Sequence, residues 1–188
     1  MLPIRRIAAP WPLGIILRTI EFVVVAALFA LSGALSGEWS SQLYSRTSDF
    51  LIGAPFALLT VLLLARNTRA ALVFPAIVVT WPFAWFLAAN IDIRGGDEYM
   101  PMRIAGLVGA ICVTLATGIA RRSLLSPLRL AGAGAAGFLA GLAFGPWLTY
   151  FHHNTNRVLD TAQALRLRDA FAVWQCAVGT YIHSMSKR

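Results

Sequence analysis

The chain has 188 residues, of which 58% are hydrophobic and 13% are charged, and its net charge is +8. Soluble domains carry roughly twice this charged fraction, so the composition argues against a soluble protein. The apolar runs are continuous rather than alternating, which argues against a transmembrane β-barrel. The composition therefore predicts an all-α, polytopic membrane helical bundle that forms one domain over residues 1–188.

Apolar runs close to the length that crosses a bilayer predict five or six transmembrane helices, with six favoured. The predicted spans cover residues 17–37, 50–65, 70–91, 102–120, 128–151 and 170–183. The last span is short for a full crossing, and the amphipathic stretch before it is expected to lie along the membrane interface. One bundle with thin connecting loops is therefore the expected architecture.

The first predicted span contains two charged residues, Arg18 and Glu21. They lie three residues apart, on one helical face near the predicted membrane boundary. A carboxylate inside lipid is costly and by default indicates a functional site, which makes Glu21 a candidate for proton or substrate coupling. The alternative is an ion pair within the helix, with the Arg18 side chain extended to the headgroups. A cleaved signal peptide is a second interpretation of this basic and then apolar segment.

The third predicted span contains a proline well inside it, Pro82. Proline removes a helical hydrogen bond, so a kink is expected there. Broken helices and buried ions often mark substrate paths in transporters. Glu21 and the break at Pro82 therefore support one alternative function, a small transporter or substrate-binding membrane component.

Two loops on the predicted outer face carry acidic and imidazole side chains. Asp92, Asp97 and Glu98 follow the third span, and His152 and His153 follow the fifth. Such groups could bind a divalent metal or perform acid–base chemistry, which supports a membrane enzyme as a further alternative. Adjacent histidines in a loop point in different directions, however, and the acids lack the spacing of helical metal ligands. A solvated loop accounts for them as well, so no metal, cofactor or catalytic residue is predicted.

Small residues recur at every fourth position of the fourth and fifth predicted spans. The two sets are Gly106, Ala110, Thr114 and Gly118, and Ala133, Gly137, Gly141 and Gly145. This spacing places each set on one helical face and lets another helix approach closely. The short link over residues 121–127 makes the two spans antiparallel neighbours, so we expect the two faces to meet.

Basic residues gather in short clusters between the apolar runs rather than on one soluble face, so nucleic-acid binding is not expected. The clusters that precede the first span and follow the second and fourth are Arg5, Arg6, Arg66, Arg69, Arg121, Arg122 and Arg129. The positive-inside rule therefore predicts a multi-pass protein of the inner (plasma) membrane with its N-terminus in the cytoplasm. Lys187 and Arg188 favour the same side for the other end, which requires an even number of crossings.

Together these features favour a non-enzymatic integral membrane protein, either alone or as a structural or accessory subunit of a membrane complex. Its expected partners are the lipid bilayer and, where it serves as a subunit, other membrane subunits. The thin loops leave little soluble surface on which to build a reaction. The transporter and the enzyme remain the two alternatives.

Overall fold

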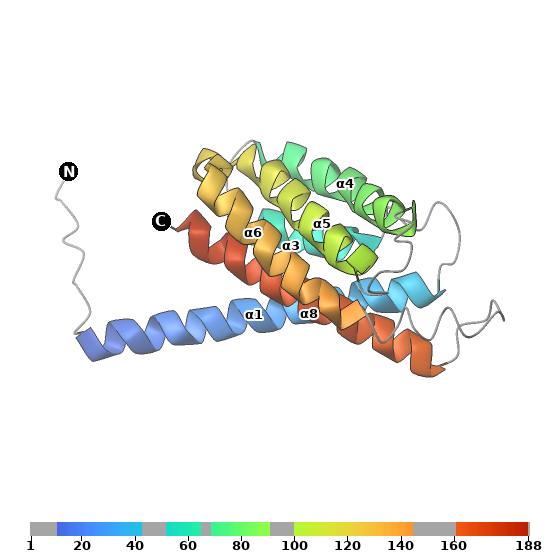
Figure 1. Ribbon diagram of the computed structural model, residues 1–188. Coiled ribbons are helices and arrows are strands. Elements are labelled where there is room, and N and C mark those ends of the chain that lie inside the picture. Colours follow the sequence, from blue (N-terminus) through green and yellow to red (C-terminus); the bar gives the residue numbers. More distant parts are fainter. Residues whose placement is uncertain (1–10, 43–51, 65–68, 91–99, 145–160, 188) are drawn as a thin grey trace.

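Figure 1 shows the computed structural model of the protein, which describes residues 11–42, 52–64, 69–90, 100–144 and 161–187. Within these ranges the regular elements are α-helices and short 3-10 helices, with no strand. The elements are α1 (Trp11–Gln42), α3 (Ala54–Leu64), α4 (Ala70–Asn90), α5 (Met100–Gly118), η1 (Arg122–Leu125), α6 (Pro127–Ala140), η2 (Gly141–Phe144) and α8 (Thr161–Ser186). The prediction of an all-α helical bundle is confirmed.

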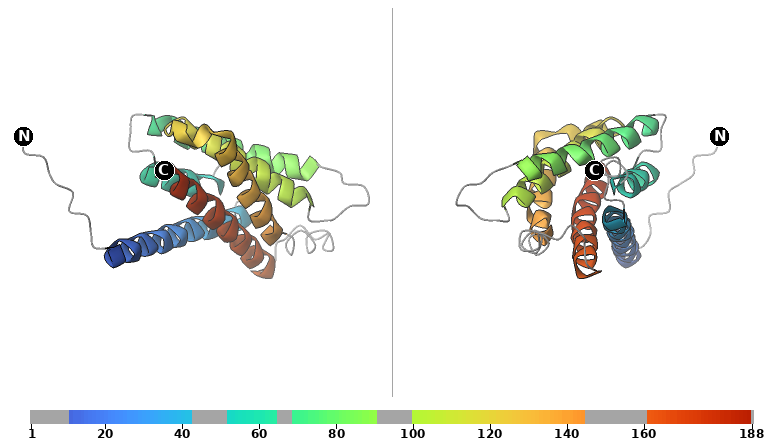
Figure 2. Two further views of the ribbon diagram at one scale, coloured as in Figure 1. Left: turned by 60° about the vertical axis from the view of Figure 1, so that its left-hand side comes forward. Right: turned by 90° about the vertical axis from the view of Figure 1, so that its right-hand side faces the viewer.

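The last helix, α8, lies in the middle of the bundle. It packs against α1, α3, α5 and α6, and Figure 2 shows these helices around it. Its large buried apolar residues recur every three or four positions, the spacing that places them along one helical stripe. They are Leu167, Phe171, Trp174, Val178 and Ile182. This periodicity explains why a helix that also carries Arg168 and Asp169 forms the centre of the fold.

The first and last helices, α1 and α8, run antiparallel. Gly37, late in α1, meets Arg168, early in α8, whereas Phe29 meets Gly179 further along α8. In consequence α1 begins, and α8 ends, at the same end of the bundle (Figure 1). The elements between them pass back and forth along the bundle, with η1 joining α5 to α6.

The buried packing of α1 against the rest of the chain begins at Val25. The helix has 32 residues, which corresponds to about 48 Å. Val25 and Phe29 are its first buried apolar side chains, whereas residues 15–24 are exposed without exception. Figure 1 shows the start of α1 projecting beyond the bundle. Before Val25, the described contact of α1 with the bundle is that of Glu21 with His183 and Lys187 of α8, and the side chains around it remain exposed.

The observed helices follow the predicted spans most closely in the middle of the chain. α4 and α5 begin and end within two residues of the predicted spans 70–91 and 102–120, and α3 falls within the span 50–65. α4 continues through Pro82 to Asn90, so the proline does not end the helix.

The fifth predicted span, 128–151, is not one uniform α-helix. α6 ends at Ala140, and the chain tightens into the 3-10 helix η2, which ends at Phe144. At the junction the N–H of Gly141 reaches the carbonyl oxygens of Gly137 and Leu139, so the turn is tighter than in an α-helix. The rest of this span lies outside the described residues.

The expected interfacial stretch is not separate from the last helix. α8 is a single helix of 26 residues, which unites that stretch with the span 170–183. Leu167 in the expected interfacial stretch is buried, as are Ala170 and Phe171 that follow it. Leu167 therefore belongs to the buried stripe of α8.

Within the described residues, two helices are long and apolar enough to cross a membrane by length and composition: Leu13–Glu38 of α1 and Met100–Gly118 of α5. Shorter apolar helices cover Ala54–Leu63, Ala71–Ala84 and Pro127–Ala143. These segments belong to α3, α4, and α6 with part of η2. Membrane-compatible helices are therefore present in the fold.

Candidate functional site

The structure brings the small residues of α5 and α6 together. A Cβ atom added to Gly106 or to Gly137 would collide with the carbonyl oxygen of the other glycine. One added to Gly137 would also lie 2.5 Å from the Cβ atom of Ala110, and one added to Gly141 would lie 2.6 Å from the carbonyl oxygen of Met102. Real Cβ atoms essentially never approach so closely, so the two backbones are in direct contact.

The other members of the two small-residue sets lie in different surroundings. Ala133 of α6 and Thr114 of α5 are fully buried, and the Thr114 hydroxyl donates to the carbonyl oxygen of Ala110 at 2.7 Å. Gly118 faces the side chain of Leu125 in η1 rather than α6, because α5 ends there and the chain turns back over it. Gly145 lies outside the described residues.

A second close contact joins α1 to α8. Gly33 and Gly37 lie four residues apart, which places them on one helical face, as in small-xxx-small packing motifs. A Cβ atom added to Gly33 would lie 2.5 Å from the Cα atom of Ala172, and one added to Gly37 would collide with the Cα atom of Arg168. The absence of side chains at these positions allows the helices to approach until their backbones touch.

Beside this contact, three polar side chains form a hydrogen-bonded chain between α1 and α8. The Ser32 hydroxyl donates to Oε1 of Gln175 at 2.6 Å, and Nε2 of Gln175 donates to the Ser36 hydroxyl at 2.8 Å. The Ser36 hydroxyl in turn donates to the carbonyl oxygen of Ser32 at 3.0 Å. Ser36 and Gln175 are fully buried, and each polar side chain finds a partner. The arrangement joins two helices and leaves no polar group directed at a ligand.

We expect Ser32 and Gln175 to be energetically coupled. In a double-mutant cycle of Ser32→Ala and Gln175→Ala, the interaction energy should be about 1 kcal/mol, within the range measured for hydrogen bonds between membrane helices. Denaturant titration of the four variants in detergent measures it. Ser184→Ala is the matched control, because the Ser184 hydroxyl bonds within α8 to Tyr181. Coupling of equal size between Ser184 and Gln175 would contradict the assignment.

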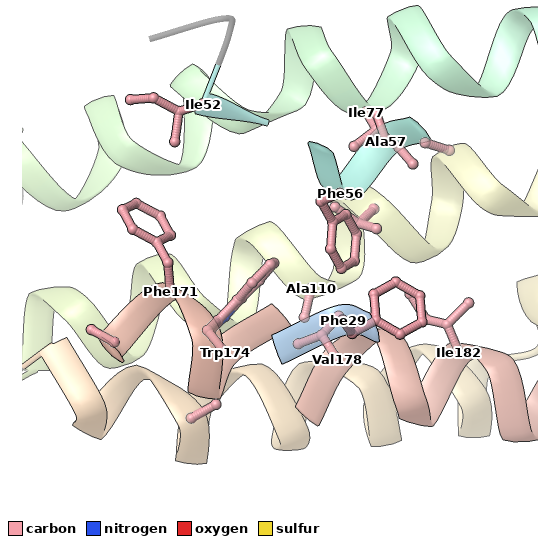
Figure 3. Close-up of a cluster of buried hydrophobic side chains, with 14 of the residues drawn as sticks. Phe29, Ile52, Phe56, Ala57, Ile77, Ala110, Phe171, Trp174, Val178 and Ile182 are labelled. Atoms are coloured by element: carbon pink, nitrogen blue, oxygen red, sulfur yellow. The ribbon is translucent and has the colours of Figure 1, made fainter. Parts of the chain in front are cut away.

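Aromatic rings fill the middle of the bundle (Figure 3). Trp174 of α8 lies 5.2 Å from Trp81 of α4 in an edge-to-face arrangement and 5.9 Å from Phe56 of α3, measured between ring centroids. Phe29 of α1 lies 5.3 Å from Phe56, and Phe171 lies 5.5 Å from Trp81. Edge-to-face and tilted pairs are favourable for aromatic quadrupoles. The cluster joins α1, α3, α4 and α8 through apolar packing.

A small apolar cavity of about 50 Å³ lies beside this cluster, between α4, α5 and α8. Its lining is Thr80, Trp81, Ala84, Met102, Ala105, Gly106, Gly109, Val113, Phe171 and Trp174. The Thr80 hydroxyl already donates to the carbonyl oxygen of Ile77 at 2.9 Å, and the indole N–H of Trp174 points to the carbonyl oxygen of Gly106 at 3.4 Å. The lining contains no ionisable side chain that could act on a polar substrate.

The structure does not place Glu21 in an intrahelical ion pair. Its partners are on α8: Nε2 of His183 lies within hydrogen-bonding distance of Oε1 of Glu21, at 3.2 Å, and Lys187 forms an ion pair with the same oxygen. Arg18 is exposed and forms no ion pair with Glu21 among the described contacts. Glu21, His183 and Lys187 therefore link α1 to α8 at the end where α8 terminates. His183 and Lys187 are partners that sequence reasoning missed.

We expect Glu21→Gln to lower the free energy of unfolding by up to about 1 kcal/mol, the value typical of half-exposed ion pairs. The amide cannot form the ion pair with Lys187, and the loss should shrink at high salt, where exposed charges are screened. Thermal unfolding at two salt concentrations measures both effects. Arg18→Gln is the control and should have no effect. An equal loss of stability from Arg18→Gln would contradict this assignment and would support an ion pair between Arg18 and Glu21 within α1.

The predicted outer-face residues lie outside the described part of the chain: Asp92, Asp97, Glu98, His152 and His153. A polar site there stays a prediction. Among the residues that are described, no group of three His, Cys, Asp or Glu side chains could hold a metal ion.

Comparison of the chain with protein-family models, curated protein sequences and solved structures finds no match.

Proposed function

We propose that the chain is a non-enzymatic, multi-pass integral membrane protein that serves as a structural or accessory subunit of a membrane complex. The observation that carries this proposal is the distribution of apolar side chains. The core is filled with aromatic and aliphatic groups, yet large apolar side chains are also exposed on the outside of six of the described helices. A protein surrounded by water would expose large apolar areas of this kind only where a partner covers them. A bilayer supplies an apolar environment on every side.

The exposed apolar residues are distributed around the bundle. Besides the first half of α1, they include Leu58 and Leu62 of α3, Leu72, Val79 and Phe83 of α4, Leu115 of α5, Leu139 of α6 and Val173 of α8. Because these helices occupy different sides of the bundle (Figure 2), a single protein partner could not cover them all. Lipid contact accounts for the whole set.

The ends of the bundle support the proposed orientation. The first residue of α1 and the last of α8 lie at one end, as six crossings require. The same end carries exposed basic residues at the start of α4, around η1 and at the end of α8, which are Arg69, Arg121, Arg122 and Lys187. Under the positive-inside rule, this end of the bundle lies on the cytoplasmic side of a bacterial-type inner membrane.

The filled interior supports a structural role over transport or catalysis. A transport path would bring a carboxylate and the break at Pro82 to one cavity. The cavity near Pro82 has no ionisable residue in its lining, and Glu21 pairs with His183 and Lys187 instead. The buried Gln175 is likewise used to join helices.

The first half of α1 is the segment that we assign to a partner subunit. Most of its side chains are large and apolar, apart from Arg18, Thr19 and Glu21, and its start projects beyond the bundle, whereas the other helices pack along most of their length. A helix of a partner subunit would bury this segment and gain the packing contacts that the chain itself does not supply. The second half of α1 would remain fixed to α8 through Gly33 and Gly37.

Topology mapping tests the membrane part of the proposal. A fluorescent protein fused after the last residue should be fluorescent, because it folds on the cytoplasmic side, whereas alkaline phosphatase fused there should be inactive. The fusion should also resist extraction from membranes with alkaline carbonate. An active phosphatase fusion would exclude six crossings, and extraction by carbonate would exclude an integral membrane protein.

Site-specific photo-crosslinking tests the subunit role. A photoreactive residue at Ile16 should form one discrete protein adduct in membranes. The same residue at Leu139, an equally exposed position on α6, should react with lipid only. Lipid adducts alone at Ile16 would reject the accessory role and leave membrane insertion standing.

A further inference from the structure

We infer that the turn between α5 and α6 is a binding surface for anionic phospholipid headgroups. This turn, residues 121–129, contains the 3-10 helix η1 and the start of α6. Arg121 and Arg122 are exposed in it, and Arg129 is half-buried. The inference rests on the proposed membrane insertion and names the lipid that this end of the protein selects.

The turn is held in one conformation by contacts with its neighbours. The guanidinium of Arg129 donates to the carbonyl oxygen of Ser123 at 2.9 Å, which closes the turn on itself. The Tyr181 hydroxyl donates to the carbonyl oxygen of Arg129 at 3.1 Å and fixes the start of α6 on α8. Leu124 is fully buried beneath the turn. The arginines are therefore presented from a fixed backbone rather than from a loose loop.

The charges near the turn are predominantly positive. Lys187 lies at the end of α8, which packs on η1, and Arg69 lies at the same end of the bundle. The acid described at this end is Glu21, and it is already paired with His183 and Lys187. Phosphate groups of an anionic headgroup supply the negative charge that complements this surface.

Apolar side chains in the same turn indicate a lipid rather than a free anion. Leu128 is 83% exposed, the largest exposure among the large apolar side chains of the described residues, and Leu125 is 42% exposed. Each lies within a few residues of an arginine. Leucine beside arginine suits the boundary between headgroups and acyl chains, where one anionic lipid contacts both. A soluble phosphate would leave the leucines in water.

Lipid binding to the purified full chain tests the inference. We would measure by native mass spectrometry how strongly the protein prefers phosphatidylglycerol over phosphatidylcholine of the same acyl chains. The wild-type protein should prefer phosphatidylglycerol, and Arg121→Gln/Arg122→Gln should reduce the preference at least about five-fold, because each basic residue near a surface contributes on the order of 1 kcal/mol. Arg122→Gln alone should give a smaller loss and serves if the double variant misfolds.

Matched controls distinguish the possible outcomes. Arg168→Gln removes a half-buried arginine toward the opposite end of the bundle, beside Asp169, and should leave the preference unchanged. Inorganic phosphate at millimolar concentration should not displace the lipid. The inference is overturned if the turn variants keep the wild-type preference, if Arg168→Gln reduces it equally, or if phosphate competes. A protein that resists carbonate extraction but shows no lipid preference would refute this inference alone and leave the proposed function intact.

Discussion

Replacing Trp174 with alanine should lower the free energy of unfolding by about 3–5 kcal/mol, the range for truncating a large buried aromatic residue. Trp174 is 4% exposed and packs on Trp81 and Phe56. Its removal would enlarge the existing cavity of about 50 Å³, and the rings around it belong to other helices that cannot all move inward together. Denaturant titration in detergent, followed by circular dichroism, measures the loss.

Val173→Ala provides the matched control for this prediction. Val173 is the preceding residue of α8, but its side chain is 51% exposed and points away from the core. The substitution should change the free energy of unfolding by less than about 1 kcal/mol, as expected for a surface position. Similar losses of unfolding free energy at Trp174 and Val173 would show that the aromatic cluster contributes no more to stability than a surface position does.

Replacing Gly137 with alanine should cost about 3 kcal/mol, the upper part of the range for overpacking. The added methyl group would meet the carbonyl oxygen of Gly106 and the Cβ atom of Ala110. Backbone and Cβ atoms cannot rotate away as the end of a long side chain can, so α5 and α6 must separate. The loss is expected even though alanine has the higher helix propensity.

Gly14→Ala is the control for this second prediction. Gly14 is also helical, but a Cβ atom there would have no neighbour within 4 Å. The substitution should leave the unfolding midpoint unchanged or raise it slightly, because alanine favours the helix. A larger loss at Gly14 than at Gly137 would refute the close contact between α5 and α6.

Several features of the site could be predicted because they depend on residues close together in sequence. Gly106 and Gly137 lie on helices joined by a short turn, so their small faces had few alternative partners. Gly118 is the exception, because it does not face α6. Its spacing matches the set, yet α5 ends at that position and Leu125 of the turn covers it. Residue spacing identifies a face and does not show where the neighbouring helix begins.

The partners of α1 depended on tertiary structure. The three-residue spacing makes Arg18 a candidate partner of Glu21, but the observed partners, His183 and Lys187, lie more than 160 residues later. Gln175 likewise reaches Ser32 and Ser36 across most of the chain. No local pattern identifies such partners, because the register between distant helices is set by the packing of the whole bundle.

The sequence by itself determined that the protein is helical, where α4 and α5 lie, and that α5 and α6 present small faces. These properties follow from hydropathy and from the 3.6-residue period, which act over a few turns. The tertiary structure alone decided that α8 is the central helix, that α1 pairs with it, and that the apolar side chains at the start of α1 remain exposed. Local forces select a helix and its apolar face, but which helix covers that face depends on how all the helices fit together.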